Sequence, residues 1–302
     1  MVNVIMTDEY DYNKVSGLMN MGNTCFMNSA LQLLFSCPMF VKFFIDNTFN
    51  DLNIIKYQTT FKDYFRKSTR GMGPKILYNR YKDIHGQYDG FSQEDAHEYL
   101  TFIIDDLDTL ISKLNATILG FSMGEFFKRL VVVQMKLSIT CQHCGFFYCG
   151  KMPENILTLS INNQDNLIDC FNNLVKVERL EGDNQWKCDR CKCNRDAEKK
   201  VIVSSFPKYL FISLNRYIYQ NGNVIKNEHS IDIPFSWQHS GNTYVLHGLI
   251  CHVGNMTGGH YFSFVNRDNK WYFINDNQIE ETCWDEIKKS FSLVYVVMFA
   301  RI

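Results

Sequence analysis

Hydrophobic and polar positions divide this chain into two parts with different periods. From about residue 24 to residue 114, apolar residues recur mostly at helical spacing, whereas from about residue 130 onward they mostly alternate as in strands. Helices that precede strands, instead of alternating with them, indicate an α+β fold. No repeat of 20–50 residues and no low-complexity linker is evident in the sequence.

Two helices stand out in the first part. One is predicted to begin after the capping candidates Asn23-Thr24 and to stop before Pro38, with apolar residues from Phe26 onward at helical spacing. The other is predicted to start at Ser92 as its N-cap and to carry one long apolar stripe from 96 to 114.

Strands are predicted for six segments of the second part. These are 131–139, 209–214, 244–253, 261–265, 271–274 and 293–299.

Composition narrows the possible classes of protein. The 302 residues are 46% hydrophobic and 21% charged, which excludes disorder, collagen and coiled coil as the dominant state. The net charge of −1 gives no bulk attraction to nucleic acid or anionic lipid, so neither partner is expected. The longest apolar run, 293–300, is shorter than the about 18 residues of a membrane-spanning helix. No basic secretory signal opens the sequence, so an intracellular location, cytoplasmic or nuclear, is expected.

Eleven cysteines in such a chain do not indicate a disulfide framework. One of them, Cys25, stands at the predicted start of the first helix, directly after a turn that contains Gly22. The positive end of the helix dipole and the unpaired N–H groups there favour thiolate over thiol. A buried apolar cysteine is the alternative interpretation.

A histidine and an Asn-Asp pair could complete a thiol-hydrolase site. His260 enters one predicted strand, and Asn275-Asp276 leaves the next. A catalytic cysteine needs an imidazole that moves a proton and a third group that fixes the imidazole tautomer. Taken singly, His260 is better explained as a satisfied polar side chain, and Asn275-Asp276 as a turn after a strand.

Four further cysteines form two Cys-x-x-Cys pairs, Cys141/Cys144 and Cys188/Cys191. Four thiolates are the ligand set of a tetrahedral structural zinc, although the 43-residue gap between the pairs exceeds that of a compact zinc ribbon. The pairs are therefore expected at the tips of separate hairpins, with a redox role as the alternative. His143 and Cys193 are spare candidate ligands.

An acidic stretch runs from residue 83 to residue 112, without Lys or Arg. A solvated helix face explains most of it. Asp95 and Glu98 lie at the predicted helix start, where the dipole stabilises acids and where they could also face a basic ligand.

Five segments resemble the ubiquitin-specific protease family, in the same order and with similar spacing. Residues 17–29 resemble its Cys box, and 258–261 and 271–276 resemble its His box. Residues 92–100 are similar to its Gln-Gln-Asp-Ala-x-Glu-Phe-Leu segment, and 206–217 to its Leu-Lys-Arg-Phe strand. The resemblance extends from Gly17 to the last residue.

The resemblance implies a papain-like cysteine peptidase fold with a helical thumb, zinc-bearing β fingers and a β palm. It places the thumb at about 17–129, the fingers at about 130–205 and the palm at about 206–302, after an N-terminal extension of residues 1–16.

The implied reaction is hydrolysis of the (iso)peptide bond that follows the last glycine of ubiquitin. The resemblance makes Cys25 the nucleophile and His260 the general base, with Asn275 orienting the imidazole. Asn20 would donate to the oxyanion, and Asp276 would support the site.

The resemblance also implies how substrate and metal are held. Ubiquitin and ubiquitinated proteins would be the partners of a monomer, with the basic ubiquitin tail held by Asp95 and Glu98 and passing a narrow approach at Gly258-Gly259. One structural Zn²⁺ would be the cofactor, held by the four paired cysteines. No organic cofactor is implied.

Departures from the family pattern are few. Glu94 replaces a Gln, Phe26 replaces a Tyr, and Asn215 replaces the Lys of the Leu-Lys-Arg-Phe strand. None is itself a catalytic position, although Glu94 could alter contacts with substrate. A ubiquitin-binding adapter with the same fold and no turnover is the main alternative, and a zinc-ribbon nucleic-acid binder is another.

Overall fold

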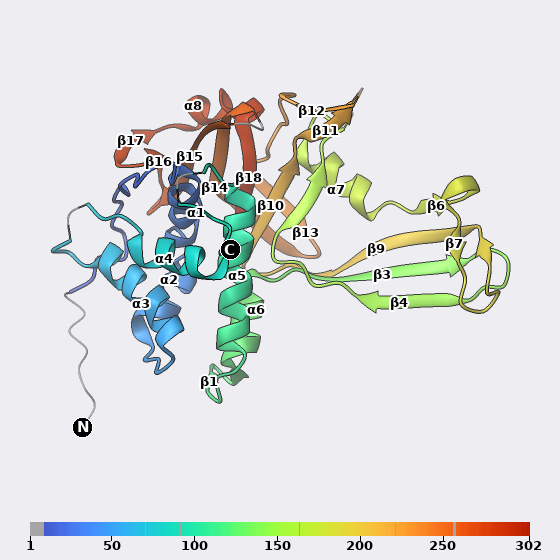
Figure 1. Cartoon of the computed structure of the whole chain (residues 1–302), viewed down its shortest axis with the longest axis horizontal. Helices are drawn as coiled ribbons and strands as arrows, with labels where there is room; N and C mark the ends of the chain where they lie inside the picture. Colours follow the sequence, from blue (N-terminus) through green and yellow to red (C-terminus); the bar gives the residue numbers. More distant parts are fainter. Residues whose placement is uncertain (1–8, 70, 91, 163, 221, 256–257) are drawn as a thin grey trace.

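The computed structural model describes residues 9–302, except 70, 91, 163, 221 and 256–257. Helices occupy one side of the molecule, a large sheet lies beside them, and a long strand ribbon projects from the other side (Figure 1). The fold class is α+β, as the sequence predicts.

The helical part is built around one fully buried helix, α1 (Cys25–Phe35), every residue of which is buried. It packs on α5 (Ala96–Ile111) and on the end of the large sheet. The other helices of this part are α2 (Pro38–Asp46), α3 (Leu52–Phe65), α4 (Lys75–Ile84) and α6 (Met123–Val131), with the small hairpin β1 (Thr117–Ile118) and β2 (Phe121–Ser122) before α6.

The first predicted helix stops before Pro38, which opens α2 because proline suits the first position of a helix. Two other predicted boundaries are wrong. The second predicted helix begins at Ala96, because the Asp95 carboxylate caps it, whereas Ser92 bonds to the side chain of Asp89. The first predicted strand begins only at Gln134, because residues up to Val131 complete α6.

The large sheet has the order β17-β16-β15-β14-β18-β10-β5, and β13 also pairs with β14. All of its pairs are antiparallel except β10 with β5. Its strands are β5 (Leu157–Ser160), β10 (Tyr209–Asn215), β13 (Ser236–His239), β14 (Asn242–Asn255), β15 (Gly258–Arg267), β16 (Lys270–Asn275), β17 (Gln278–Thr282) and β18 (Val294–Arg301). Five of the six predicted strands therefore lie in this sheet.

The projecting ribbon is a four-stranded sheet of order β4-β3-β9-β6 (Figure 1). Its strands are β3 (Gln134–Cys141), β4 (Phe147–Lys151), β6 (Glu178–Leu180) and β9 (Ala197–Ser205), and the 3-10 turn η1 (Gly182–Asn184) and the pair β7 (Trp186–Lys187) and β8 (Asn194–Arg195) lie at its far end.

Part of the segment that is expected to form the fingers lies outside the projecting ribbon. Within 130–205, strand β5 pairs with β10 of the large sheet, and α7 (Leu167–Val175) packs against β5 and β9. The ribbon alone is therefore called the fingers below, the large sheet the palm, and the helical part the thumb.

The remaining elements lie between palm strands in the sequence. A separate hairpin joins β11 (Tyr217–Gln220) to β12 (Asn223–Lys226), and α8 (Trp284–Lys288) and η2 (Phe291–Leu293) precede β18. Across the described ranges, no single helix is long and apolar enough to cross a membrane; α1 and α2 reach that length and composition only as a pair bent by 88°.

Candidate active site

The first turn of α1 presents Cys25. Gly22 has a φ of 103° and Asn23 a φ of 54°, so the chain reverses sharply just before the helix. Glycine is required at Gly22 because a side chain strains that backbone conformation. Thr24 holds the N-cap position, but its hydroxyl accepts from the N–H of Met21 instead of capping the helix. Cys25 itself is only 4% exposed.

Burial decides the state of this thiol. It raises the pKa of Cys25, and the Asp276 carboxylate raises it further, whereas the backbone N–H groups of Tyr261, Phe26 and Cys25 itself favour the thiolate. The helix-start effect predicted from the sequence is present, but desolvation outweighs it. The helix start alone therefore does not favour the thiolate of Cys25, which makes the base that is expected from the sequence necessary.

The strand that carries His260 contacts this cysteine through its backbone. Tyr261, whose backbone N–H faces the Cys25 sulfur, directly follows His260 on β15. Nε2 of His260 lies 2.6 Å from Oδ1 of Asn275, the last residue of the neighbouring strand β16. Because a side-chain oxygen of Asn only accepts, Nε2 carries the proton and Nδ1 is left as the basic nitrogen.

Asp276 anchors the other side of the site. Its carboxylate accepts from Nδ2 of Asn20 at 2.9 Å and from Nδ2 of Asn28 at 2.7 Å. The Oδ1 atom of Asn20 accepts from the N–H groups of Gly22 and Thr24. The Asn20 side chain is thus fixed at its oxygen and at one amide hydrogen, which leaves its second amide hydrogen available to a ligand.

The segment before Cys25 contacts the turn at Asp276 directly. Leu18 donates from its N–H to the carbonyl of Asp276 at 2.8 Å. A Cβ at Gly17 would lie 2.5 Å from Cα of Asn277, so only glycine allows this approach. The segment around Cys25 and the turn at Asp276 are therefore joined by backbone contacts as well as by side-chain hydrogen bonds, although they lie near opposite ends of the sequence.

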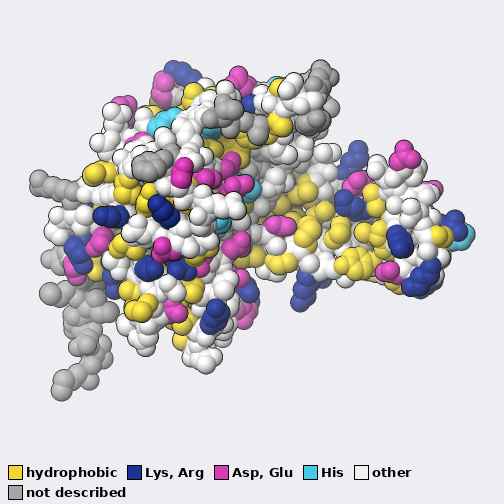
Figure 2. Space-filling view, in the orientation of Figure 1, with side chains coloured by type: hydrophobic (Ala, Val, Ile, Leu, Met, Phe, Trp, Pro, Cys, Tyr) yellow, Lys and Arg dark blue, Asp and Glu magenta, His cyan; other side chains and the backbone are white. Residues whose placement is uncertain are grey.

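A cleft of about 840 Å³ opens next to these residues, between the thumb and the palm. Glu94, Asp95 and Glu98 line its thumb side, and Gly258 and Tyr261 line its palm side. Figure 2 shows a group of Asp and Glu side chains near the middle of this face of the molecule, whereas Lys and Arg side chains lie both on the thumb and at the finger tip. The acidic side chains of this cleft would attract a basic ligand.

Asp95 has a structural task in addition to its place in the cleft. Its Oδ1 caps α5 by accepting from the N–H groups of His97 and Glu98, and its Oδ2 accepts from the Tyr295 hydroxyl at 2.5 Å. Glu98, in contrast, is exposed on the first turn of the helix. The sequence predicts both acids as substrate contacts, but hydrogen bonds fix the Asp95 carboxylate, whereas the Glu98 side chain is exposed.

The palm side of the cleft requires glycine. A Cβ at Gly259 would lie 2.2 Å from Nε2 of His252 and 2.3 Å from the carbonyl of Val253. The N–H of Gly259 also donates to Oε1 of Gln93 at 2.6 Å, so thumb and palm are bridged across the cleft. This lack of space explains why residue 259 itself is a glycine, whereas the narrow approach at Gly258-Gly259 stays a prediction.

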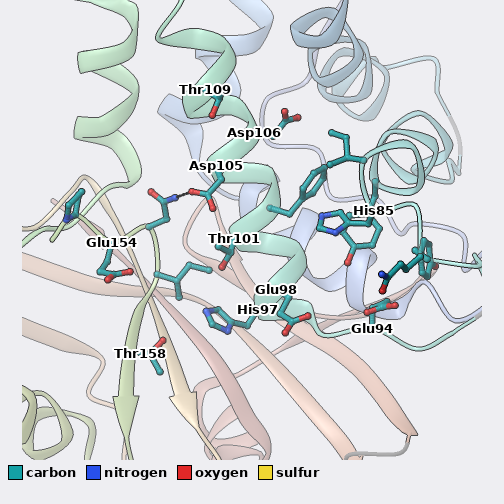
Figure 3. Close-up of a pocket in the computed structure, with 18 residues that line it drawn as sticks. His85, Glu94, His97, Glu98, Thr101, Asp105, Asp106, Thr109, Glu154 and Thr158 are labelled. Atoms are coloured by element: carbon teal, nitrogen blue, oxygen red, sulfur yellow. Dashed lines mark hydrogen bonds between the residues drawn. The ribbon is translucent and has the colours of Figure 1, made fainter.

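A second cavity, of about 980 Å³, lies farther from Cys25 along the thumb. Figure 3 shows successive turns of α5 contributing His97, Thr101, Asp105 and Thr109 to its wall, with Glu154 across from them. Burial raises the pKa of Glu94, which lines both cavities, and the neighbouring Glu98 raises it further. The acidic surface thus continues from the cleft toward the base of the fingers.

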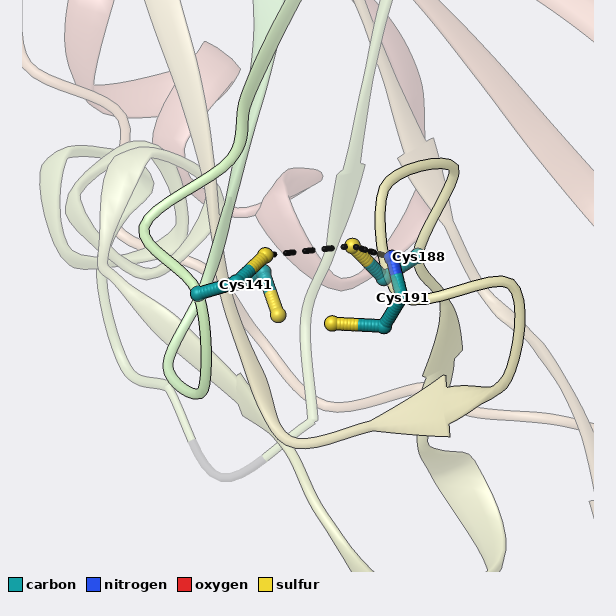
Figure 4. A group of neighbouring side chains, drawn as sticks. Cys141, Cys188 and Cys191 are labelled. Carbon is teal, nitrogen blue, oxygen red and sulfur yellow. Dashed lines mark hydrogen bonds between the residues drawn. The ribbon is translucent and has the colours of Figure 1, made fainter.

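The paired cysteines meet at the finger tip (Figure 4). The Sγ atoms of Cys141, Cys144, Cys188 and Cys191 all lie within 4.8 Å of one another, and those of Cys144 and Cys188 are 3.7 Å apart. Sulfurs around a tetrahedral Zn²⁺ at about 2.3 Å are separated by about 3.8 Å, so this donor set fits a metal ion. Within the described residues, the cluster includes neither His143 nor Cys193.

Several residues of the site carried no prediction. Asn28 follows Cys25 by three positions and was visible in the Cys box, but its bond to Asp276 depends on the fold. Gln93 and His252 touch Gly259 from the thumb and from β14. Only tertiary contacts reveal these roles.

A family model described as ubiquitin carboxyl-terminal hydrolase matches residues 16–299. Ubiquitin carboxyl-terminal hydrolase 5 of Saccharomyces cerevisiae is 26% identical, over 88% of this chain and 42% of its own length. Ubiquitin carboxyl-terminal hydrolase Usp2 of Drosophila melanogaster is 26% identical, over 94% of this chain and 34% of its own length. The chain thus spans less than half the length of these two curated relatives.

Solved structures share the fold. The SAGA DUB module that contains Ubp8, bound to monoubiquitin, matches with a TM-score of 0.82 and 23% identity, over 100% of this chain and 72% of that chain. The same kind of module bound to ubiquitin aldehyde matches with a TM-score of 0.79 and 23% identity, over 99% of this chain and 71% of that chain.

Proposed function

Because this chain belongs to the ubiquitin carboxyl-terminal hydrolase family, we propose that it is a deubiquitinating cysteine peptidase. Its substrates are ubiquitinated proteins, and it cleaves the (iso)peptide bond after the last glycine of ubiquitin. The observation that carries the proposal is the His260–Asn275 pair beside Cys25 at the start of α1.

The reaction begins with proton transfer. Nδ1 of His260 takes the thiol proton of Cys25, because burial keeps that thiol protonated in the free enzyme. The sulfur then bonds to the carbonyl carbon of the ubiquitin glycine, and the carbonyl oxygen becomes an oxyanion. His260 gives its proton to the leaving amine as the C–N bond breaks, and water hydrolyses the remaining thioester with His260 again as base.

Charge on the oxyanion is stabilised by two donors. One is the second amide hydrogen of Asn20, whose side chain is already oriented by Asp276. The other is the backbone N–H of Cys25, which lies at the start of α1 and thus at the positive end of the helix dipole. Donors that are fixed before the reaction cost no reorganisation in the transition state.

The acidic cleft selects the substrate. We infer that Glu94, Asp95 and Glu98 attract a basic ubiquitin tail, and that this tail passes the glycines Gly258 and Gly259 on the palm side. Similarity to modules that are bound to monoubiquitin and to ubiquitin aldehyde supports ubiquitin as the ligand.

Zinc is the metal that we propose for the four-cysteine cluster. Cys141, Cys144, Cys188 and Cys191 would hold it at the finger tip, far along the ribbon from Cys25 (Figure 1). Four thiolates fill a tetrahedral shell, so the ion organises the fingers and leaves no position for a catalytic water.

Hydrolysis of a fluorogenic ubiquitin C-terminal amide tests the proposal. The wild-type chain should cleave it, and Cys25→Ser should abolish cleavage while ubiquitin binding persists. Cys149→Ser is the matched control, because Cys149 is exposed on β4 of the fingers and should not affect the rate. A wild-type chain that binds ubiquitin but never cleaves the amide would instead be a silent adapter.

A further inference from the structure

The hairpin β11–β12 stands apart from the palm sheet. It forms a two-stranded sheet of its own after Arg216, and its exposed residues include Val224 and Ile225. Two-stranded hairpins are at best marginally stable in water. The position of this hairpin therefore depends on the side chains that tie it to the rest of the fold.

Lys226, the last residue of β12, makes such a tie. Its Nζ atom donates to the carbonyl of His252 at 2.8 Å and to the carbonyl of Gly254 at 3.0 Å, and it lies 3.2 Å from Nδ1 of His252. An ammonium group has three N–H donors, so these three acceptors use all of them. Both carbonyls belong to the end of β14, at the rim of the acidic cleft.

This arrangement fixes the state of His252. The Lys226 ammonium has no lone pair, so Nδ1 of His252 must accept and cannot carry a proton. The imidazole is therefore neutral, with its hydrogen on Nε2. The Tyr217 hydroxyl lies 3.5 Å from the same Nδ1 atom, from the other strand of the hairpin.

His252 in turn supports the backbone that carries the catalytic histidine. It is 4% exposed, and its ring packs on the Tyr261 ring with centroids 4.4 Å apart. Its Nε2 occupies the space that a side chain at Gly259 would need. Gly259 and Tyr261 flank His260, so a displaced or charged His252 would disturb this wall of the cleft.

Electrostatics agrees with the geometry. Burial, Lys226 and His260 together lower the pKa of His252 to about 4, against the opposing effect of Asp95. The titratable groups around the imidazole, from every element packed against it, are Tyr217, Lys226, His260, Tyr261, Tyr295 and Asp95.

We propose that Lys226 is a positioning residue, which pins the β11–β12 hairpin to the end of β14 and keeps His252 neutral beneath the cleft. Its effect on turnover rests on the proposed function, because it acts through the cleft that receives the ubiquitin tail. Its effect on the hairpin and on His252 does not depend on any substrate.

The kinetic test is Lys226→Met, which removes the ammonium and keeps most of the side-chain length. With the fluorogenic ubiquitin amide, KM should rise about tenfold, the usual effect of losing one charge-assisted hydrogen bond, while kcat changes less than about twofold. Lys208→Met is the matched control, because Lys208 is also half-buried and donates to a backbone carbonyl. Lys208 lies just before β10, whereas the β11–β12 hairpin follows the other end of that strand. An unchanged KM in Lys226→Met would overturn the role in the cleft.

The second test uses the protein without substrate. In the wild type, NMR should show no titration of His252 between pH 5.5 and 8, whereas in Lys226→Met its midpoint should move upward and amides of β11 and β12 should exchange faster. A thermal melt should show that both proteins are folded. Identical titration of His252 and identical amide exchange in the two folded proteins would then overturn the proposal. If neither protein cleaves the amide but these differences appear, the proposed function fails and the positioning role stands.

Discussion

Oδ1 of Asn275 accepts a hydrogen bond from Nε2 of His260 at 2.6 Å. This single contact sets the imidazole tautomer, since an amide oxygen is only an acceptor. In the proposed reaction, Nδ1 is therefore the nitrogen that serves as the base for Cys25. Because burial raises the pKa of that thiol, the proposed reaction depends on this pair more than on the helix start.

Asn275→Ala should lower kcat by about 10²–10⁴-fold with little change in KM, because the imidazole loses its fixed tautomer and orientation. Asn275→Asp should retain most of the activity, since a carboxylate oxygen accepts the same hydrogen bond. Steady-state hydrolysis of the fluorogenic ubiquitin amide measures both. Equal losses in the two variants would show that Asn275 does not act through acceptance from His260.

Asn20→Ala should lower kcat by about 10²–10³-fold, the usual cost of one oxyanion donor. Since Asp276 holds the Asn20 amide, Asp276→Ala should lower kcat too, and the double variant should be little worse than Asn20→Ala alone. If the kcat losses of the two single variants multiply in the double variant, the two residues act independently and the coupling between Asn20 and Asp276 is contradicted. A rise in KM alone would assign Asn20 to binding.

Asp276→Asn should shift the reactivity of Cys25 toward lower pH. The Asp276 carboxylate disfavours the thiolate and so raises the Cys25 pKa; removing its charge lowers that pKa, and more thiolate exists at any given pH. The alkylation rate by iodoacetamide, followed against pH in the free enzyme, reports this shift. A midpoint that stays or moves upward would contradict the electrostatic role of Asp276.

Asp95→Ala should both destabilise the protein and weaken ubiquitin binding. Loss of a helix N-cap costs about 1 kcal/mol, which corresponds to about 2 °C in Tm for a chain of 302 residues. Glu98→Ala is the control that separates charge from capping, because Glu98 lines the cleft but is exposed. It should raise KM and leave Tm within about 1 °C. Unchanged Tm in Asp95→Ala would contradict the cap.

Metal analysis of protein purified without chelators should give about one zinc per chain. Cys188→Ser should lower Tm and ubiquitin affinity together, because the finger tip loses its cross-link. Cys193→Ser is the matched control, since Cys193 is exposed in the same loop and lies outside the cluster. Zinc-free wild-type protein that is as stable as metal-loaded protein would refute a structural ion.

Much of this fold could be predicted from periodicity. The α+β class and five palm strands follow from apolar spacing, because burial on one face imposes a period of two on strands and 3.6 on helices. The sequence alone predicts the wrong start for α5, because Ser92 and Asp95 are equally good caps by residue type. Which one caps depends on the Asp89 and Tyr295 side chains that reach them in the folded chain.

For the site, the sequence alone determined the chemical inventory: a cysteine at a helix start, a histidine and an amide on neighbouring strands, and two pairs of thiols. Residue type and local spacing carry that information. The tertiary structure decided the state and partners of these groups, such as the raised pKa of Cys25 and the attachment of Asn20 to Asp276, 256 positions away. Desolvation and long-range hydrogen bonds depend on what surrounds a side chain in space, and no local pattern in the sequence encodes those surroundings.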